Sequence, residues 1–373
     1  MTPPDRRQAT RRRPSLSDGG RLLVAAAALA PLGLLSALGG PRADGVAAFG
    51  SSAADETRVA RFDRWTALRS STLAREEVAS ARIGRFIYVV GGFVPPGLTT
   101  TTAVERYDIR RDRWRRLPSM PVALNHAAAV AYRGKLYVHG GYPDLLNTRT
   151  QTGLYRFNPR RNRWKRLQPS PSPRGAHAAA VIGHRLYVAG GTNEEASLRS
   201  LDVYDFRRRR WLQGPSFRGP ARHHTQGVAA DGFFYVLAGR SGGETLIERR
   251  LHPTAGRDYR SVDRYDPHRN RWRRLPPMRR ERSGFGAAAL ADGRLVVFGG
   301  EDWPNRVPGA NVIGRVELFT PRTERWSRLP PMRTPRHALA AAALGNRIYA
   351  AEGSTLPRAV AESNLLEVLD IPR

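Results

Sequence analysis

Short apolar segments separated by turn-forming residues recur along the chain from residue 61 to the C-terminus. Each unit begins with a small-residue segment, such as 127–130 or 287–290, and continues with an apolar segment that ends in two glycines. A Val-x-x-Tyr-Asp type of segment and a segment containing Trp follow. Short runs bounded by Gly, Pro, Asn and Asp predict β-strands, so each unit is expected to form four antiparallel strands. The glycine pairs are Gly91–Gly92, Gly140–Gly141, Gly190–Gly191 and Gly299–Gly300.

A tryptophan marks the last segment of each unit, at positions 65, 114, 164, 211, 272 and 326. The spacings are 49, 50, 47, 61 and 54 residues, and a Tyr or Phe stands seven residues before every Trp from the second onward. A period of this size predicts a β-propeller or a solenoid. Alanine suits the innermost strand of a blade, where blades converge, and Trp supplies the large apolar area needed toward the rim.

The two ends of the repeat complement each other. Trp65 has Arg58 seven residues before it instead of an aromatic residue, while the last unit reaches 366–370 and stops before any Trp. If residues 61–68 supply the outer strand of the last blade, the ring closes with six blades and no open sheet edges. The prediction is an all-β, six-bladed propeller over residues 61–373.

The glycine pair, the Tyr one strand later and the Trp after it resemble the Kelch repeat, and the resemblance covers residues 61–373. The fourth and sixth units depart from the pattern, with Gly239–Arg240 and Glu352–Gly353 in place of the glycine pair. The resemblance implies a propeller like the central domain of galactose oxidase or like N-acetylneuraminate epimerases. The copper-radical site of galactose oxidase requires a cysteine, and this chain has none.

Residues 1–45 have the order of an export segment. Six arginines precede residue 22, and an uncharged Ala/Leu/Gly stretch covers 22–40. The order predicts a signal, similar to the twin-arginine type around Arg11–Arg13. The alternative is an uncleaved membrane-anchor helix, because 22–40 just reaches the length that spans a bilayer. In both cases residues 46–60 are a linker and the propeller is exported, to the periplasm, the cell surface or the medium. The remaining alternative is a disordered basic tail on a cytoplasmic protein, and export is the favoured interpretation.

The formal net charge of +30 comes almost entirely from arginine, since Lys135 and Lys165 are the only lysines. Clustered cations can mark nucleic-acid binding. Here, however, the arginines recur in one short segment of every repeat, such as Arg110–Arg111 and Arg160–Arg161, which favours a solvated edge protected by cations. Nucleic acid is therefore not an expected partner. The absence of cysteine excludes disulfides, thiolate metal sites and cysteine nucleophiles.

The long loops after the glycine pairs share one rim with the residues that open each first strand, and long loops on a rigid scaffold usually carry function. Five arginines stand 16 or 17 residues before the glycine positions, and Leu124 takes this place in the second unit. The resemblance to Kelch adaptor domains implies that such arginines bind acidic groups of a ligand. The alternative is an architectural role, with guanidinium groups donating to blade carbonyls. These arginines are Arg75, Arg174, Arg222, Arg282 and Arg336.

Histidines and carboxylates also fall on this rim. Converging imidazoles can hold a metal, but the offsets of these histidines from the glycine positions differ, so a repeat-derived structural role and no metal site are expected. The catalytic candidates are Glu301, which lies in an acid pair beside Trp303, and Glu352, which replaces a glycine. The histidines are His126, His177, His223, His224 and His337.

Two functions stay open from the sequence. The first is an exported, non-catalytic binding module that recognises a protein or glycan, with an acidic ligand if the arginines bind it. The second is a carbohydrate-active enzyme of the acidic-sugar epimerase or mutarotase type, in which Glu301 or Glu352 moves a proton. Neither hypothesis requires a cofactor, and a monomer is expected.

Overall fold

The computed structural model describes residues 64–372, apart from 97–98, 146–148, 243, 248–249, 254–255, 303–310 and 358–360, and only the backbone of 244–247 and 250–253. The predicted export segment and linker lie outside the described residues. Among the described residues, no helix has the length and apolar character needed to cross a membrane.

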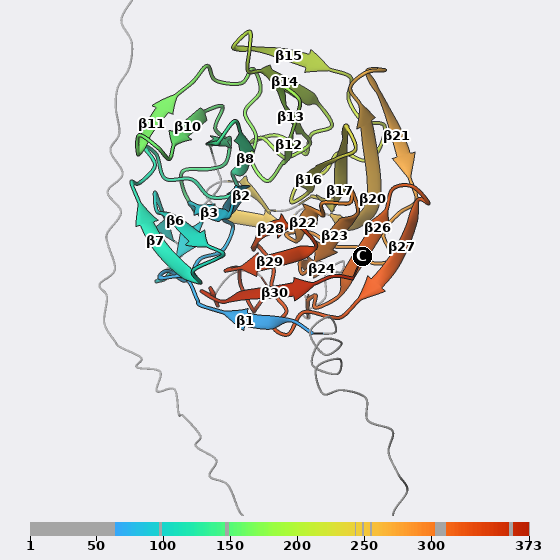
Figure 1. The fold of residues 1–373 in the computed structure, drawn as a ribbon. Coiled ribbons are helices and arrows are strands. Elements are labelled where there is room, and N and C mark those ends of the chain that lie inside the picture. Colours follow the sequence, from blue (N-terminus) through green and yellow to red (C-terminus); the bar gives the residue numbers. More distant parts are fainter. Residues whose placement is uncertain are drawn as a thin grey trace, which may run out of the picture. The chain divides into compact units, whose positions relative to one another are not determined.

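The described chain forms six four-stranded antiparallel sheets arranged as blades around an axis (Figure 1). Five blades run from the inside outward in chain order. These are β2 (Ala79–Ile83), β3 (Phe86–Val90), β6 (Val104–Asp108) and β7 (Arg113–Leu117); β8 (Ala128–Tyr132), β9 (Lys135–His139), β10 (Leu154–Asn158) and β11 (Arg163–Arg166); β12 (Ala178–Ile182), β13 (Arg185–Ala189), β14 (Leu201–Asp205) and β15 (Arg210–Gly214); β16 (Gln226–Ala230), β17 (Phe233–Ser241), β20 (Arg257–Asp266) and β21 (Arg271–Leu275); and β22 (Gly286–Ala289), β23 (Leu295–Phe298), β26 (Val316–Thr320) and β27 (Arg325–Leu329).

The sixth blade joins the two ends of the propeller. Its inner strands are β28 (Ala340–Leu344), β29 (Arg347–Ala351) and β30 (Leu366–Asp370), and its outer strand is β1 (Thr66–Leu68). β1 pairs antiparallel with β30, with Thr66 opposite Val368 and Leu68 opposite Leu366. The six-bladed ring closed by an N-terminal outer strand is thus confirmed.

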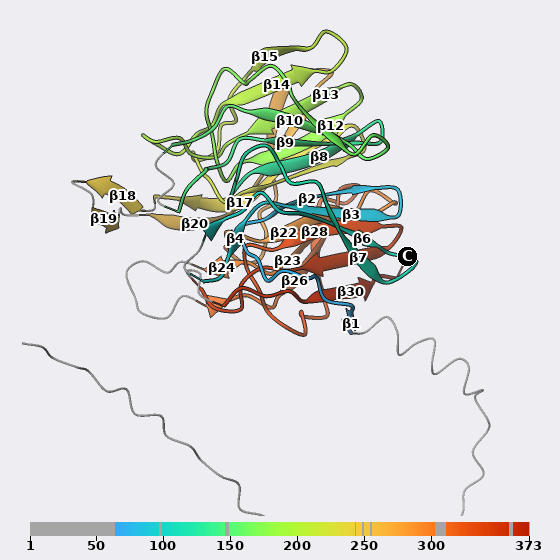
Figure 2. The same ribbon diagram turned by 90° about the vertical axis from the view of Figure 1, so that its left-hand side faces the viewer.

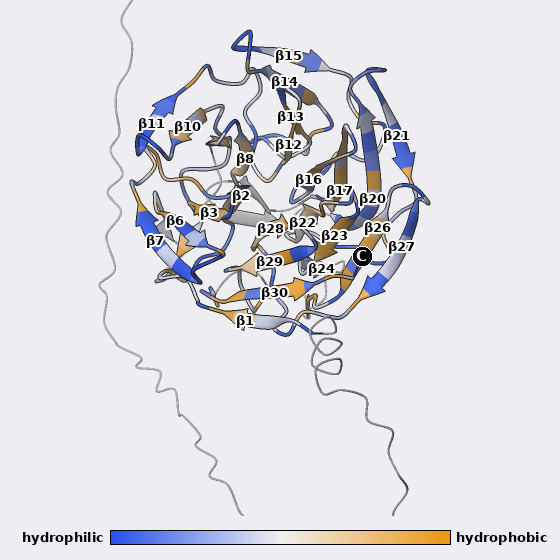
Figure 3. Ribbon diagram, viewed as in Figure 1, coloured by the Kyte–Doolittle hydropathy of each residue, from blue (hydrophilic) through white to orange (hydrophobic). Residues whose placement is uncertain are grey.

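Side-chain size follows the distance from the axis. The inner strands are rich in alanine, and Ala178 and Ala340 are at most 1% exposed. The outer strands alternate a buried or half-buried Trp with exposed arginines, as in β7, where Trp114 lies between Arg113 and Arg115. Figure 3 shows this as hydrophobic middle strands and largely hydrophilic outer strands in five blades, whereas β1 of the sixth blade is not hydrophilic. Much of the positive charge therefore lies on the solvated edge.

The repeated tryptophans also bond neighbouring blades. Each indole Nε1–H donates to a backbone carbonyl where the preceding blade ends: Trp65 to Pro330, Trp114 to Arg69, Trp164 to Pro118, Trp211 to Gln168, Trp272 to Pro215 and Trp326 to Pro276. Each Trp therefore fills the gap between blades and satisfies its one polar group there.

The residues at the glycine-pair positions connect each blade to the next one by a backbone hydrogen bond. In every blade the second residue of the pair donates its backbone N–H across the interface, as Gly92 does to the Leu124 carbonyl at 2.8 Å. The first residue lies so close to the same carbonyl that a Cβ on Gly91 would stand 2.1 Å from the Leu124 oxygen. In the fourth blade the pair is Ala238–Gly239, with φ of 42° and 99°, rather than Gly239–Arg240 as the sequence suggested.

One face of the propeller carries the longer connections. The hairpins β4 (Phe93–Val94)–β5 (Thr99–Thr100), β18 (Glu244–Ile247)–β19 (Arg250–Pro253) and β24 (Glu301–Asp302)–β25 (Asn311–Val312) all follow a glycine-pair position. Figure 2 shows β18 and β19 projecting at its left, beyond the ends of β17 and β20. We call this side, where the first strand of each blade begins, the loop-bearing face.

Candidate functional site at the channel mouth

The blades meet around a central channel, and the opening of this channel on the loop-bearing face is called the mouth. Six equivalent residues, one from each blade, surround the mouth. All have a left-handed backbone, with φ between 49° and 58°. Backbone hydrogen bonds join neighbours in this ring: His126 N donates to Glu77 O at 3.1 Å, and Ala176 N donates to His126 O at 2.8 Å. We call the set the mouth ring. Its members are Glu77, His126, Ala176, His224, Gly284 and Ala338.

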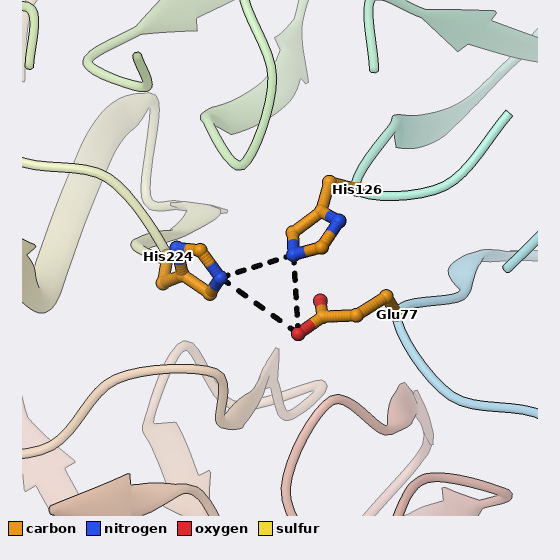
Figure 4. Close-up of side chains that lie close together, drawn as sticks. All are labelled: Glu77, His126 and His224. Carbon is orange, nitrogen blue, oxygen red and sulfur yellow. Dashed lines mark hydrogen bonds and ion pairs between the residues drawn. The ribbon is translucent and has the colours of Figure 1, made fainter. Parts of the chain in front are cut away.

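Three polar side chains of the mouth ring converge on one point (Figure 4). His126 Nε2 lies 3.0 Å from His224 Nε2 and 3.2 Å from Glu77 Oε1, and His224 Nε2 lies 3.7 Å from the same oxygen. The other three members are alanine or glycine, which leaves room for the long side chains. The cavity at this point has a volume of about 120 Å³ and is lined by the mouth ring and by the residues that follow it in each blade, many of which are alanine.

Neighbouring groups fix which ring nitrogen of each imidazole carries hydrogen. His126 Nδ1 lies 2.6 Å from Asn125 Oδ1, and the Asn125 amide is oriented because its Nδ2 donates to Thr100 Oγ1 and Asp144 O. Nδ1 of His126 therefore donates, and Nε2 is the ring nitrogen that faces the mouth.

The second imidazole is fixed through its neighbour His223. His223 Nε2 donates to the Gly242 carbonyl, so His223 Nδ1 accepts from Nδ1–H of His224. His224 Nε2 is thereby left with a lone pair, which accepts from Arg240 Nη2 at 3.1 Å. Both imidazoles consequently direct Nε2 toward the centre of the mouth.

Burial and nearby charge set the protonation of these groups. Burial would raise the pKa of Glu77, but the adjacent His126 imidazole, together with His337 and Arg240, holds that pKa below its usual value. Burial and the positive charge of Arg240 lower the pKa of His224 well below its usual value. The mouth thus presents a carboxylate beside a neutral imidazole.

Further acids surround the mouth ring. Glu76 is fully buried beside Glu77. Burial, followed by the charge of Glu77, raises the pKa of Glu76 to about 8. Glu301, a catalytic candidate, is 2% exposed and lies 2.5 Å from Arg240. The two acids of the predicted Glu301–Asp302 pair have different partners, because Asp302 accepts a hydrogen bond from Arg280. Trp303, the aromatic residue beside them in the sequence, lies outside the described residues.

The five arginines singled out in the sequence are all fully buried, and each forms an ion pair with the acid that lies three residues before the end of the third strand of its own blade. Nη1 or Nη2 of each also donates to blade carbonyls, as Arg282 does to Gly299 and Arg315. The pairs are Arg75–Glu105, Arg174–Asp202, Arg222–Asp263, Arg282–Glu317 and Arg336–Glu367.

The second blade has a hydrophobic contact in place of this ion pair. Leu124 stands at the arginine position and Tyr155 at the acid position, and both are buried in one hydrophobic cluster. Charge and counter-charge are therefore replaced together. These contacts favour the architectural alternative for the arginines. The predicted ligand-binding role would need an exposed guanidinium, and all five guanidinium groups are buried.

Glu352, the other catalytic candidate, occupies the first glycine-pair position of the last blade, with φ of 58°. Its carboxylate is fully buried and lies 2.9 Å from Arg75 of the first blade. Burial raises the pKa of Glu352 to about 7 despite the opposing charge of Arg75. This group is titratable, but it lies between blades rather than in the mouth cavity.

Comparison with known proteins settles the family. A model of the KLHDC2/KLHL20/DRC7 Kelch-repeats domain matches residues 77–300, more than half of the chain, and a Kelch motif model matches 281–333. The chain belongs to the Kelch-repeat family. Its repeats are of the protein-interaction module type.

Several proteins are similar to this Kelch-repeat chain. Human Kelch-like protein 34 is 26% identical over 292 residues, covering 75% of this chain and 35% of that protein. Kelch-like protein terF of Aspergillus terreus is 26% identical over 294 residues, 74% and 61% of the two chains. The human Influenza virus NS1A-binding protein is 39% identical over 80 residues, 21% and 11%. The chain thus spans between about a third and three fifths of the first two relatives.

Among solved structures, YjhT has the same fold. The TM-score is 0.65, with 17% sequence identity, and the match covers 81% of this chain and 99% of YjhT. At this identity the likeness concerns the propeller alone.

The five histidines singled out in the Kelch repeats separate into different roles. His126 and His224 meet in the mouth, and His223 supports His224 from behind. His177 pairs with His139 at 3.0 Å within the blades, where burial lowers the pKa of both imidazoles. His337 Nε2 bonds the Leu356 carbonyl at 2.7 Å.

Sequence reasoning missed Glu77 and Arg240 as members of the site and placed His224 out of line with His126. The signal was present in the spacing. Counted from Ala238, the true first residue of the fourth pair, His224 stands 14 residues before the pair, as do Glu77 and His126 in their blades.

Proposed function

We propose that this chain is an exported, non-catalytic binding module that recognises a protein or glycan ligand on its loop-bearing face, with the mouth ring at the centre of the contact. The observation that carries the proposal is the size of the mouth cavity. Pockets that enclose a small-molecule substrate have volumes of roughly 300 to 1,000 Å³. A cavity of about 120 Å³ suits the tip of a ligand, such as one side chain or one sugar substituent.

Two further features support a contact on this face. The large apolar side chains that are most exposed among the described residues, Leu145 and Leu356, at 44% and 51%, both lie in its loops. One similar protein is named for binding another protein, the viral NS1A. The carbohydrate-enzyme alternative gains no support, because the arginines expected to hold a sugar carboxylate are buried and paired within their blades.

The glycan arm of the proposal is tested on an array of neutral and acidic glycans. The full chain is compared with Glu77→Ala/His224→Ala in the mouth and with Arg110→Ala/Arg111→Ala, which lie in an exposed turn on the opposite face. We expect binding that the mouth variant loses and the control keeps. If the wild-type protein catalyses sialic-acid mutarotation and Glu301→Gln abolishes it, the binding-module hypothesis is wrong and the carbohydrate-enzyme hypothesis is supported.

The protein arm uses a photo-crosslinking amino acid at position 145 or 356, with position 110 as the control. We expect one discrete adduct from the two loop positions and none from the control. Equal crosslinking from position 110, together with no selective glycan binding, would contradict the proposal that the loop-bearing face binds the ligand.

Export is proposed on the order of residues 1–45 alone. The full chain is expected outside the cytoplasm after expression in a bacterial host. Arg12→Lys/Arg13→Lys is expected to retain it inside if the twin-arginine route is used, and export unchanged by this variant points to the general route.

A further inference from the structure

Three donor atoms of the mouth ring stand at the separations that a single metal ion requires. A divalent ion about 2.1 Å from each donor gives donor separations of roughly 3.0 to 3.7 Å, for ligand angles between about 90° and 125°. The observed separations between Glu77 Oε1, His126 Nε2 and His224 Nε2 are 3.0, 3.2 and 3.7 Å. None of the three ligand side chains has to move to a new place for one ion to contact all three atoms.

The donor atoms also face the same point. With Nδ1 of His126 held by Asn125 and Nδ1–H of His224 donated to His223, the Nε2 atoms of the two imidazoles face each other at 3.0 Å. In the neutral form of each ring, this tautomer carries the lone pair on Nε2. Two such nitrogens and a carboxylate oxygen at these distances need a proton or another cation among them, and in the structure Arg240 contacts His224 Nε2 from one side.

The groups behind the imidazoles match those that support metal-binding histidines. Such histidines donate their second N–H to a carbonyl or carboxylate, which fixes the tautomer and the ring orientation. His126 has the Asn125 carbonyl in this place, and the Asn125 amide is itself held by two hydrogen bonds. His224 has His223, which is anchored on the Gly242 carbonyl.

We propose that Glu77, His126 and His224 bind one divalent first-row transition-metal ion at the mouth of the channel. Two imidazoles and one carboxylate form a three-donor set that leaves coordination positions open toward the cavity. A ligand oxygen, from a carboxylate or a sugar hydroxyl, would complete the coordination. The site departs from the sequence expectation of purely structural histidines, and it stands whether or not the proposed module function holds.

Arg240 competes with the metal for one donor. When the ion binds His224 Nε2, the guanidinium leaves that nitrogen and keeps its ion pair with Glu301. Replacing Arg240 by an uncharged residue should therefore leave metal affinity unchanged or increase it.

The test uses the full chain without a histidine tag, stripped with EDTA and titrated with Zn²⁺ by calorimetry and with Co²⁺ by visible absorption. One equivalent of Co²⁺ should produce ligand-field bands of a nitrogen- and oxygen-coordinated ion. His126→Ala and His224→Ala should each weaken binding at least 100-fold, and Glu77→Gln at least 10-fold. His268→Ala, an exposed histidine outside the mouth, should bind like the wild type, and Arg240→Met should bind at least as tightly.

Each variant is first melted without metal to establish that it folds. In the wild type, excess Zn²⁺ should then raise the melting temperature, and in His126→Ala/His224→Ala it should not. Zn²⁺ affinity and stabilisation equal in this double variant and in the wild type would overturn the proposal, as would the absence of any Co²⁺ spectrum. A loss in Arg240→Met as large as in the histidine variants would also overturn it.

Discussion

The Glu352 carboxylate lies 2.9 Å from the Arg75 guanidinium, and this ion pair joins the last blade of the propeller to the first. Arg75 also pairs with Glu105 of its own blade at 3.1 Å. Two carboxylates therefore share one buried cation. The glycine-pair position that Glu352 occupies carries no charge in the other five blades.

This arrangement predicts a pH-dependent stability. Burial raises the pKa of Glu352 from 4.5 to about 7, so the folded chain binds this proton more tightly than the unfolded chain. The contribution of Glu352 to the free energy of unfolding consequently falls as pH rises from 4.5 through 7, by about 3 kcal/mol. Glu352→Gln should reduce this decline in urea unfolding between pH 5 and 8 to the part that the buried Glu76 contributes, whereas Glu324→Gln, which removes a half-buried acid paired with Arg273, should leave the decline unchanged. A pH profile shared by all three proteins would contradict the assignment.

The buried arginines are predicted to stabilise the blades. Arg174→Met leaves Asp202 buried without its counter-charge, which should lower the free energy of unfolding by about 3 to 5 kcal/mol. Arg160→Met in an exposed turn should stay within about 0.5 kcal/mol. The double variant Arg174→Leu/Asp202→Tyr copies the Leu124/Tyr155 pair of the second blade, so it should recover part of the loss. A single variant as stable as the wild type would remove the architectural role.

The close approach between blades can be separated from backbone conformation with two glycines. Gly91 and Gly84 have similar φ, 64° and 59°, but only Gly91 faces a neighbouring carbonyl, and a Cβ on Gly84 would meet nothing within 4 Å. Gly84→Ala should cost about 1 kcal/mol from its left-handed conformation. Gly91→Ala should cost about 2 to 4 kcal/mol in the same unfolding experiment. Equal costs would mean that the neighbouring carbonyl can withdraw freely.

Ring closure depends on Trp65. The indole is 3% exposed and packs near Phe298 at a ring separation of 5.7 Å. Trp65→Ala should lower the free energy of unfolding by about 3 to 5 kcal/mol. The neighbouring Arg64 is exposed, and Arg64→Ala should have no measurable effect. An unchanged melting temperature for Trp65→Ala would show that the ring does not need its N-terminal strand.

The propeller was predictable because its signals are periodic and local. The constant offset between the aromatic residue and Trp fixes the outer hairpin of each blade, and the unmatched Trp65 identifies the closing strand. The mouth was not predictable in the same way, because Ala238 in place of glycine shifted the count in the fourth unit and hid the equivalence of His224 with His126. Tautomers and side-chain convergence depend on Asn125 and His223, which only the folded chain brings into place.

The arginines illustrate a different limit. Their spacing correctly located them at the opening of each first strand, but position alone does not tell whether a guanidinium faces solvent or a buried acid. The residue three positions before the end of each third strand held the missing information, since Asp202 and Glu317 accompany arginines whereas Tyr155 accompanies Leu124.

The central claim is that the three side chains at the channel mouth bind a metal ion and are not only structural. Anomalous diffraction from crystals of the full chain grown with one equivalent of Co²⁺ tests this claim most directly. The predicted result is a single anomalous peak within about 2.0 to 2.3 Å of His126 Nε2, His224 Nε2 and a Glu77 carboxylate oxygen. A map with no peak at the mouth, or with its peak at a surface histidine such as His268, would contradict it.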